Sequence, residues 1–106
     1  MKISFFRGDD HQVQFKLKNF TATIEKMFFT VKCKEKILRI QKKLNDGIEF
    51  DGEYYVISFV PEDTNNLGCY LKMVYDIQIE VGGKKITIIK DEFEILEDVT
   101  TPKEEV

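Results

Sequence analysis

The side chains best suited to chemistry are acidic residues near the only histidine. Asp9 and Asp10 precede His11, and Glu62 with Asp63 forms a second acidic pair. Hard cations such as Ca²⁺ prefer clustered carboxylate oxygens, so these five residues are candidates for an ion site. Neither segment has the alternating ligand spacing of a dedicated calcium loop, however. The sequence therefore favours acidic surface turns over an ion site, and it predicts no metal and no cofactor.

The residue types and their spacing also disfavour catalysis. One histidine without a Cys, Ser or carboxylate partner at a recognisable spacing makes no triad, and no Gly-rich phosphate loop follows a strand. A structural zinc site is excluded because His11 and two cysteines are too few nitrogen and sulfur ligands. We therefore expect the protein not to be an enzyme.

Composition sets the class of the protein. The chain has 106 residues, 42% hydrophobic and 33% charged, with a formal net charge of -3, which predicts one ordinary globular domain. The interspersed charges form no basic stripe for nucleic acid. No apolar run reaches membrane-spanning length, and no signal-peptide core follows Met1-Lys2. We expect neither nucleic acid nor membrane as a partner, and synthesis in the cytoplasm.

The elements that would position these side chains are strands, organised around the stretch Tyr75–Ile95. Tyr75, Ile77, Ile79 and Val81 alternate with polar residues, so one strand face is apolar. Gly82-Gly83 then predicts a tight hairpin turn, because glycine readily adopts the positive φ angles that such a turn requires. The chain returns through Ile86 to Ile95 with a charged break at Lys90-Asp91. A second layer must cover the apolar face.

Earlier segments supply that layer. Lys34–Leu44 fits both helical and strand spacing, and we favour a strand because the surrounding chain has a period of two. Pro61 ends a strand and can begin one helical turn. The other expected strands are Ile3–Phe6, Gln12–Lys18, Met27–Cys33, Tyr54–Val60 and Cys69–Val81.

The fold class predicted from this pattern is all-β. About seven short antiparallel strands with regular turn signals are typical of an immunoglobulin-like β-sandwich, with a small barrel as the alternative. We expect residues 1–100 to form this domain and residues 101–106 to form a flexible acidic tail.

Several segments stand in a characteristic order. The first half contains Phe6-Arg7-Gly8-Asp9-Asp10, Phe28-Phe29-Thr30-Val31-Lys32, and Gln41-Lys42-Lys43-Leu44 before Asn45-Asp46-Gly47-Ile48. The second half contains Pro61-Glu62-Asp63-Thr64, Tyr75-Asp76-Ile77, and Phe93-Glu94-Ile95 ending in Asp98-Val99-Thr100. From about Lys2 to Thr100 their order resembles small phage and prophage structural proteins. In particular, it is similar to the N-terminal domain of baseplate upper proteins of tailed phages of Gram-positive, low-GC bacteria.

The resemblance implies an immunoglobulin-like sandwich and a role in virion architecture rather than catalysis. The implied partners are phage tail or baseplate proteins and other copies of the chain. The implied location is the bacterial cytoplasm during synthesis and then the virion. Two departures, Lys72-Met73 and Asp91-Glu92 at positions where such sequences often have Gly, imply altered loop geometry and put the same neighbour contacts in doubt. Cys33 and Cys69 are expected as reduced thiols, with pairing after particle release left open.

Candidate contact residues come from the alternation itself. Phe28, Tyr54, Val56 and Ile89 fall on strand faces that the period of two would expose. Such residues indicate a subunit interface or a second face covered by the chain's own loops, and the sequence leaves both open. We expect an assembly module. The alternative is a stand-alone binding module that recognises a host-surface glycan or protein.

Overall fold

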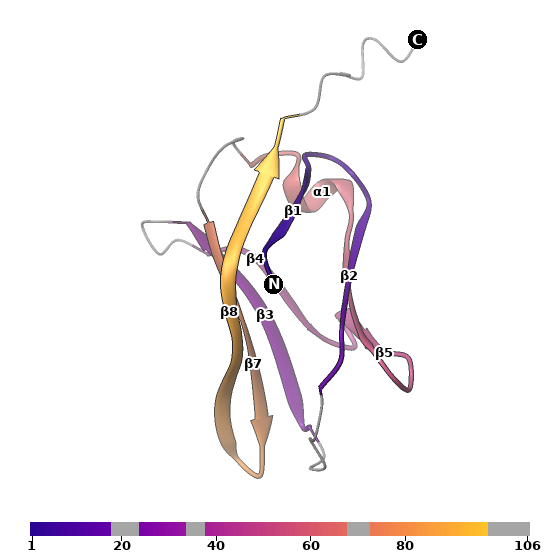
Figure 1. Ribbon diagram of the computed structural model, residues 1–106, viewed down its shortest axis with the longest axis vertical. Coiled ribbons are helices and arrows are strands. Elements are labelled where there is room, and N and C mark those ends of the chain that lie inside the picture. The colour runs from indigo at the N-terminus through magenta and orange to yellow at the C-terminus, as the bar shows by residue number, and fades with distance from the viewer. Residues whose placement is uncertain (18–23, 34–37, 68–72, 98–106) are drawn as a thin grey trace.

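The protein belongs to the all-β class, and Figure 1 shows the path of the chain; its described part contains strands and one helical turn. The computed structural model describes residues 1–17, 24–33, 38–67 and 73–97. The described strands are β1 (Ile3–Phe6), β2 (His11–Phe15), β3 (Lys26–Cys33), β4 (Leu38–Leu44), β5 (Gly47–Phe50), β6 (Tyr55–Phe59), β7 (Met73–Val81) and β8 (Lys84–Leu96), with α1 (Pro61–Thr64) between β6 and β7. The all-β prediction is confirmed, and so are the helical turn at Pro61 and the strand character of residues 38–44.

The strands form one eight-stranded sheet in the order β1-β8-β7-β3-β4-β5-β6-β2. The prediction of about seven strands was one too few, because β5 has only four residues and lies between the turn residues Asn45-Asp46 and Asp51-Gly52. The expectation of purely antiparallel pairing was also wrong, since β1 lies parallel to β8. The link between β4 and β5 is likewise parallel and very short.

A sharp bend at residues 45–47 turns the sheet over on itself. Asn45 has a φ of 70° and Gly47 a φ of 100°, backbone conformations that residues other than Gly or Asn rarely adopt. The bend is closed by the Asp46 N–H to the Lys43 carbonyl at 2.8 Å and the Asn45 N–H to the Ile48 carbonyl at 2.7 Å. A Cβ on Gly47 would lie 2.5 Å from Lys42 Cδ, so glycine is required here.

The β7–β8 hairpin has the predicted turn and an unpredicted bulge. Gly82 and Gly83 have φ angles of 57° and 76°, which confirms the positive values expected there. β8 then runs without a break through Lys90-Asp91, so the predicted interruption was wrong. The irregularity lies earlier, because Ile89 is opposite Ile77 whereas Thr87 is opposite Gln78, which leaves Ile88 as the extra residue.

The core lies between β1, β8, β7, β3 and β4 on one side and β5, β6 and β2 on the other. Aromatic rings join the two sides: Phe29 of β3 lies 5.5 Å from Phe59 of β6, and Phe5 of β1 lies 5.0 Å from Phe59, between ring centroids. The inward faces predicted for β3, β6 and most of β7 are confirmed. The largest fully buried side chains are Tyr75, Phe29, Phe59, Phe93, Met27, Ile48, Ile57, Met73, Ile77, Ile79, Ile95 and Val31.

Polar contacts fasten α1 to the strands around it. The Asp63 carboxylate accepts a hydrogen bond from the Val60 N–H and pairs at 2.7 Å with Lys42 Nζ, whose side chain points inward from β4. The fully buried Thr64 hydroxyl accepts a hydrogen bond from the Gly8 N–H at 2.8 Å. The turn between β1 and β2 is thereby held against α1.

Several expectations fall on residues outside the described ranges. These are the strand residues Lys18, 34–37 and 69–72, the thiol of Cys69, and the tail at residues 101–106. Cys33 is buried and lies opposite Met73. The expectation of reduced thiols therefore stays a prediction, and the pairing of Cys33 with Cys69 stays open.

Candidate functional site

The four predicted contact residues do not form one surface. Phe28 lies on the outer face of β3, half-buried, opposite Lys43 and Gln78. Val56 lies on the outer face of β6, on the other side of the core, opposite Gln14 and Glu49.

Tyr54 and Ile89 are placed differently from each other. Tyr54 precedes β6, and the Lys16 ammonium lies 5.9 Å above its ring. Ile89 was predicted to face outward, but the bulge at Ile88 shifts the alternation. Ile89 is opposite the buried Ile77 and packs against the core. The placement of Ile89 on an exposed face was therefore wrong.

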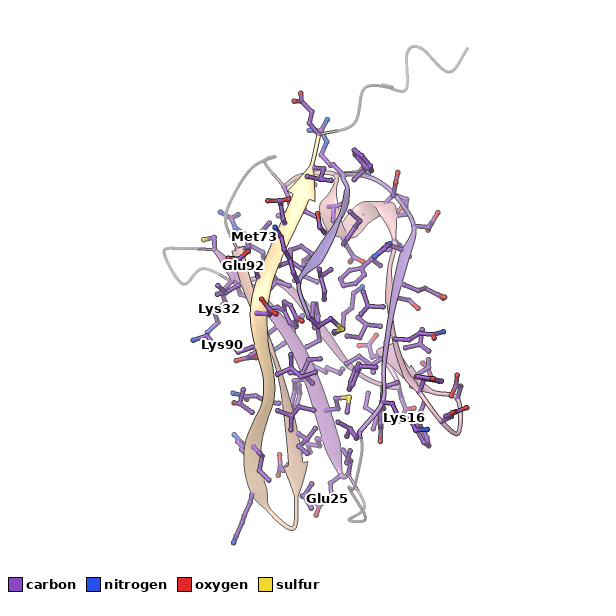
Figure 2. The ribbon with its side chains drawn as sticks, viewed as in Figure 1. Lys16, Glu25, Lys32, Met73, Lys90 and Glu92 are labelled. Atoms are coloured by element: carbon purple, nitrogen blue, oxygen red, sulfur yellow. The ribbon has the colours of Figure 1, made fainter. Side chains whose placement is uncertain are left out.

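The strongest candidate surface is the outer face of β4, β3, β7 and β8, which we call the four-strand outer face. Directly opposite residues on neighbouring strands share a face, so the register defines its rows. The rows are Leu38, Lys32, Val74 and Glu92; Gln41, Thr30, Asp76 and Lys90; Lys43, Phe28, Gln78 and Thr87; and Lys26, Glu80 and Lys85. In Figure 2, Lys32 and Lys90 project away from the interior, on the side opposite β2.

This face combines exposed apolar side chains with charges of both signs. Leu38 is 52% exposed and Val74 is 45% exposed, and Lys32 lies between them in the same row. The Gln41 Nε2 donates to Thr30 Oγ1 at 3.3 Å, and the Gln78 Nε2 donates to Thr87 Oγ1 at the same distance. Protein contact surfaces likewise combine apolar groups with hydrogen-bonding side chains.

Two shallow hollows lie on or beside this face. One, of about 450 Å³, lies between the rows of Leu38 and Gln41 and includes Asp76 and Lys90 in its wall. The other, of about 280 Å³, lies beside Phe28 and Lys43 near the bend. Four strands spaced by about 4.8 Å and about 30 Å long cover roughly 500 Å², which approaches the area that one partner contributes to a small protein interface.

A second exposed group is aromatic and lies where β5 and β6 meet. Phe50 is 52% exposed, and its ring centroid lies 4.6 Å from that of Tyr55, which in turn stacks at 5.4 Å on Phe15. The turn beside it is rigid, because the Asp51 carboxylate accepts hydrogen bonds from the N–H groups of Glu53 and Tyr54. These bonds hold the pKa of Asp51 below its usual value.

Sequence reasoning missed Leu38, Val74 and Phe50. A period of two places Leu38 in the inward phase of Ile40, but the register shift between Val31 and Lys32 sets it opposite the outward Lys32. Val74 lies in the outward phase of β7, between the buried Met73 and Tyr75. Phe50 lies in the strand that was not predicted. An apolar residue directly before the turn pair Asp51-Gly52 was the available signal for it.

The acidic residues considered as an ion site are engaged elsewhere or dispersed. Asp63 pairs with Lys42, and the His11 ring stacks on Phe5 with 4.5 Å between centroids. Within the described ranges, no group of three or more His, Cys, Asp or Glu side chains lies close enough to hold a metal ion.

Among the described residues, the titrating group with the largest pKa shift is Tyr75, and its role is structural. Burial, and secondarily the nearby Asp91 carboxylate, raises the pKa of Tyr75 to about 12. Its hydroxyl donates to the Met1 carbonyl. The Met1 amino group donates to Asp91, and this hydrogen bond lowers the pKa of the Asp91 carboxyl. Tyr75 is thus protonated at neutral pH and acts as a hydrogen-bond donor rather than as a base.

Comparisons with known proteins give no relatives: no protein-family model matches the chain, and no curated protein matches it. In the part of the chain that the structure describes, no helix is long and apolar enough to cross a membrane.

Proposed function

We propose that the protein is a non-enzymatic structural component of a phage or prophage tail, acting at the baseplate as an assembly module. It is made in the bacterial cytoplasm and is then incorporated into the virion. Its partners are neighbouring tail or baseplate proteins, which it contacts through the four-strand outer face.

The proposed fold is an immunoglobulin-like sandwich, and the strand order supports it. In such domains one sheet contains strands in the order G, F, C, C′ and the other contains D, E and B. β8, β7, β3 and β4 occur in the first order and β5, β6 and β2 in the second. The bend at residues 45–47 accounts for the single hydrogen-bonded sheet, because it carries the chain from one layer to the other through two residue pairs.

The observation that carries the proposed function is the composition of the four-strand outer face. Leu38 and Val74 expose apolar surface at a hollow whose wall also carries Asp76 and Lys90. Apolar residues that gather at a hollow are a feature of protein contact surfaces, because a docked partner removes them from water. Opposite charges beside them would set the orientation of the partner.

Immunogold labelling of particles released from the source strain tests this function. We expect an antibody against the protein to label the tail tip, and mass spectrometry of purified particles to find the chain at constant stoichiometry. Absence of the chain from the particles would contradict the proposal. A gene that lies in a locus without tail genes would contradict it as well.

Two variants with matched exposure locate the contact. Leu38 and Phe50 are both 52% exposed, but they lie on different surfaces. Leu38→Asp should reduce incorporation into particles at least about tenfold, because it places a charge in the docking face. Phe50→Asp should leave incorporation unchanged. The reverse result would move the contact away from the four-strand outer face.

The second candidate is a stand-alone module that binds a host-surface glycan or protein, and Phe50 is the observation that favours it. An exposed ring supported by Tyr55 is a flat apolar platform on which a sugar ring can stack. Titration with glycans followed by tyrosine fluorescence tests this candidate. Saturable binding that Phe50→Ala removes and Leu38→Asp leaves intact would support it.

A further inference from the structure

One edge of the sheet lacks the usual protection against pairing. β2 is the last strand in the sheet order, and among the described residues only β6 pairs with it. Its five residues, His11-Gln12-Val13-Gln14-Phe15, include no Lys, Arg, Asp, Glu or Pro. Natural sheets blunt exposed edges with charges, prolines or bulges, because unpaired N–H and C=O groups recruit another strand.

The other edge strand, β1, provides the contrast. Lys2 lies next to it and forms ion pairs with Glu92 and Glu94 of β8, both at 3.7 Å. Ser4 within β1 donates to Glu94. The Lys2 charge beside β1 is therefore engaged by carboxylates of its own sheet, although neither edge strand contains a Lys, Arg, Asp or Glu itself.

Opposite charges stand at the two ends of β2. Asp9 and Asp10 precede the strand, and Lys16 follows it directly. If two copies of β2 lie antiparallel with Val13 opposite Val13, Asp10 of each copy lies opposite Lys16 of the other. The same register places Gln12 opposite Gln14 twice.

We propose that β2 is a self-association edge, at which two copies of the chain pair antiparallel about a two-fold axis at Val13. This inference rests on the proposed role in assembly and names one partner, a second copy. The contact is isologous, since the same strand serves both sides. Because the edge is short, we expect the dimer to be weak in isolation, with a dissociation constant on the order of 100 µM.

The side chains of β2 are arranged so that pairing disturbs neither core. His11, Val13 and Phe15 point inward, where His11 stacks on Phe5 and Phe15 stacks on Tyr55. The exposed Gln12, Gln14 and Lys16 lie on the outer face. Lys16 Nζ contacts Glu53 at 3.2 Å with its side chain still 47% exposed, so the ammonium can also donate to a second carboxylate.

The charges select one register. Shifting one strand by a single residue would place an inward side chain opposite an outward one, which sheets avoid. A shift by two residues in either direction places Asp10 opposite Gln14, or Lys16 opposite Gln12, and loses the ion pairs. Only the register centred on Val13 pairs Asp10 with Lys16 at both ends.

Sedimentation equilibrium of three proteins tests the proposal. The wild type should pass from 12.5 kDa to twice that mass between about 10 µM and about 1 mM. Gln12→Lys/Gln14→Lys places like charges opposite each other twice and should weaken association at least about tenfold. Gln12→Lys/Gln14→Glu places opposite charges at the same two positions and should associate at least as tightly as the wild type.

The two double variants alter the same exposed positions, so equal thermal unfolding midpoints serve as the folding control. A wild type that stays monomeric at about 1 mM would overturn the edge dimer, as would equal association of the two variants. Neither result bears on tail labelling, which is measured on particles. Conversely, a dimer with the expected charge dependence but no presence in particles would leave the edge contact standing and remove the proposed function.

Discussion

The two ends of the molecule are fastened in different ways. At the α1 end, buried or half-buried polar groups join separate elements: Lys42 to Asp63 at 2.7 Å, and the Gly8 N–H to Thr64 Oγ1 at 2.8 Å. At the opposite end, the tip of the β7–β8 hairpin extends away from α1 (Figure 1), and among the described side chains its turn is held by Glu25, which accepts from the Gly82 N–H.

Burial also differs within the hairpin end itself. Ile79 and Ile86 are directly opposite each other on the inner face of the hairpin, yet Ile79 is 1% exposed and Ile86 is 43% exposed. Residues of the same type on the same face thus differ because the covering layer ends between them. The comparison teaches that the extent of the opposite layer, and not the alternation alone, decides what is core.

The largest effect expected from this comparison is at Ile79. Ile79→Ala should lower the free energy of unfolding by about 2 to 4 kcal/mol, because it removes buried methyl groups and leaves a cavity. Ile86→Ala should cost about 0.5 kcal/mol or less. Urea unfolding followed by circular dichroism measures both. Equal losses would show that Ile86 is buried in solution and would remove the contrast between the two strands of the hairpin.

Alternation explains how much of the fold was predictable. It identified the inward faces of β3, β6 and most of β7, because directly paired strands over one core keep a period of two. It failed at Ile89, where the bulge at Ile88 resets the phase, and it gave no sign that Ile86 lies beyond the covering layer. Both depend on packing between distant segments, which a local pattern does not contain.

The next largest effect is expected at the α1 end, from Asp63. Asp63→Ala should destabilise the fold by about 2 to 3 kcal/mol, because it leaves the Lys42 ammonium without its partner and the Val60 N–H without its acceptor. The side chains of Asp63 and Lys42 are 18% and 14% exposed, so water compensates little. Urea unfolding at pH 7 measures the loss.

A double variant separates the cost of an unpaired Lys42 ammonium from the loss of the ion pair itself. Lys42→Met/Asp63→Leu removes both charges and should be more stable than Asp63→Ala, since no unpaired ammonium remains. If the double variant is the less stable of the two, the ion pair itself is the stabilising contact, and the account of an uncompensated charge is wrong.

Tyr75 lies between the two ends, where β7 passes the start of β1, and it gives a pH-dependent test. Its pKa is raised from 10.0 to about 12, so the unfolded chain loses this proton first as the pH rises. The contribution of this proton to the free energy of unfolding is fully present below pH 10 and is lost between pH 10 and 12. The loss amounts to about 1.4 kcal/mol at pH 11. Tyr75→Phe should remove this part of the decline. Identical declines in both proteins would contradict the assignment to Tyr75.

The candidate site was less predictable than the fold. Phe28 was identified correctly as an outward residue of β3, but its neighbours Leu38 and Val74 were not. Their exposure depends on register across β4, β3 and β7, and a sequence does not state which strands pair. The neutral edge of β2 was visible in the residues, but its position as the last strand was not.

The smallest effect is expected at the hairpin tip, from Glu25. Its Oε1 accepts the Gly82 N–H at 2.8 Å in an exposed position, so water replaces the contact when it is removed. Glu25→Ala should therefore cost only about 0.3 to 0.5 kcal/mol in global unfolding. Amide hydrogen exchange should nevertheless speed up at Gly82 and Gly83 while the amides of β3 keep their protection, because the tip opens locally. A global loss as large as that of Asp63→Ala would show that both ends belong to one cooperative unit, and the contrast between a fastened end and a free one would fail.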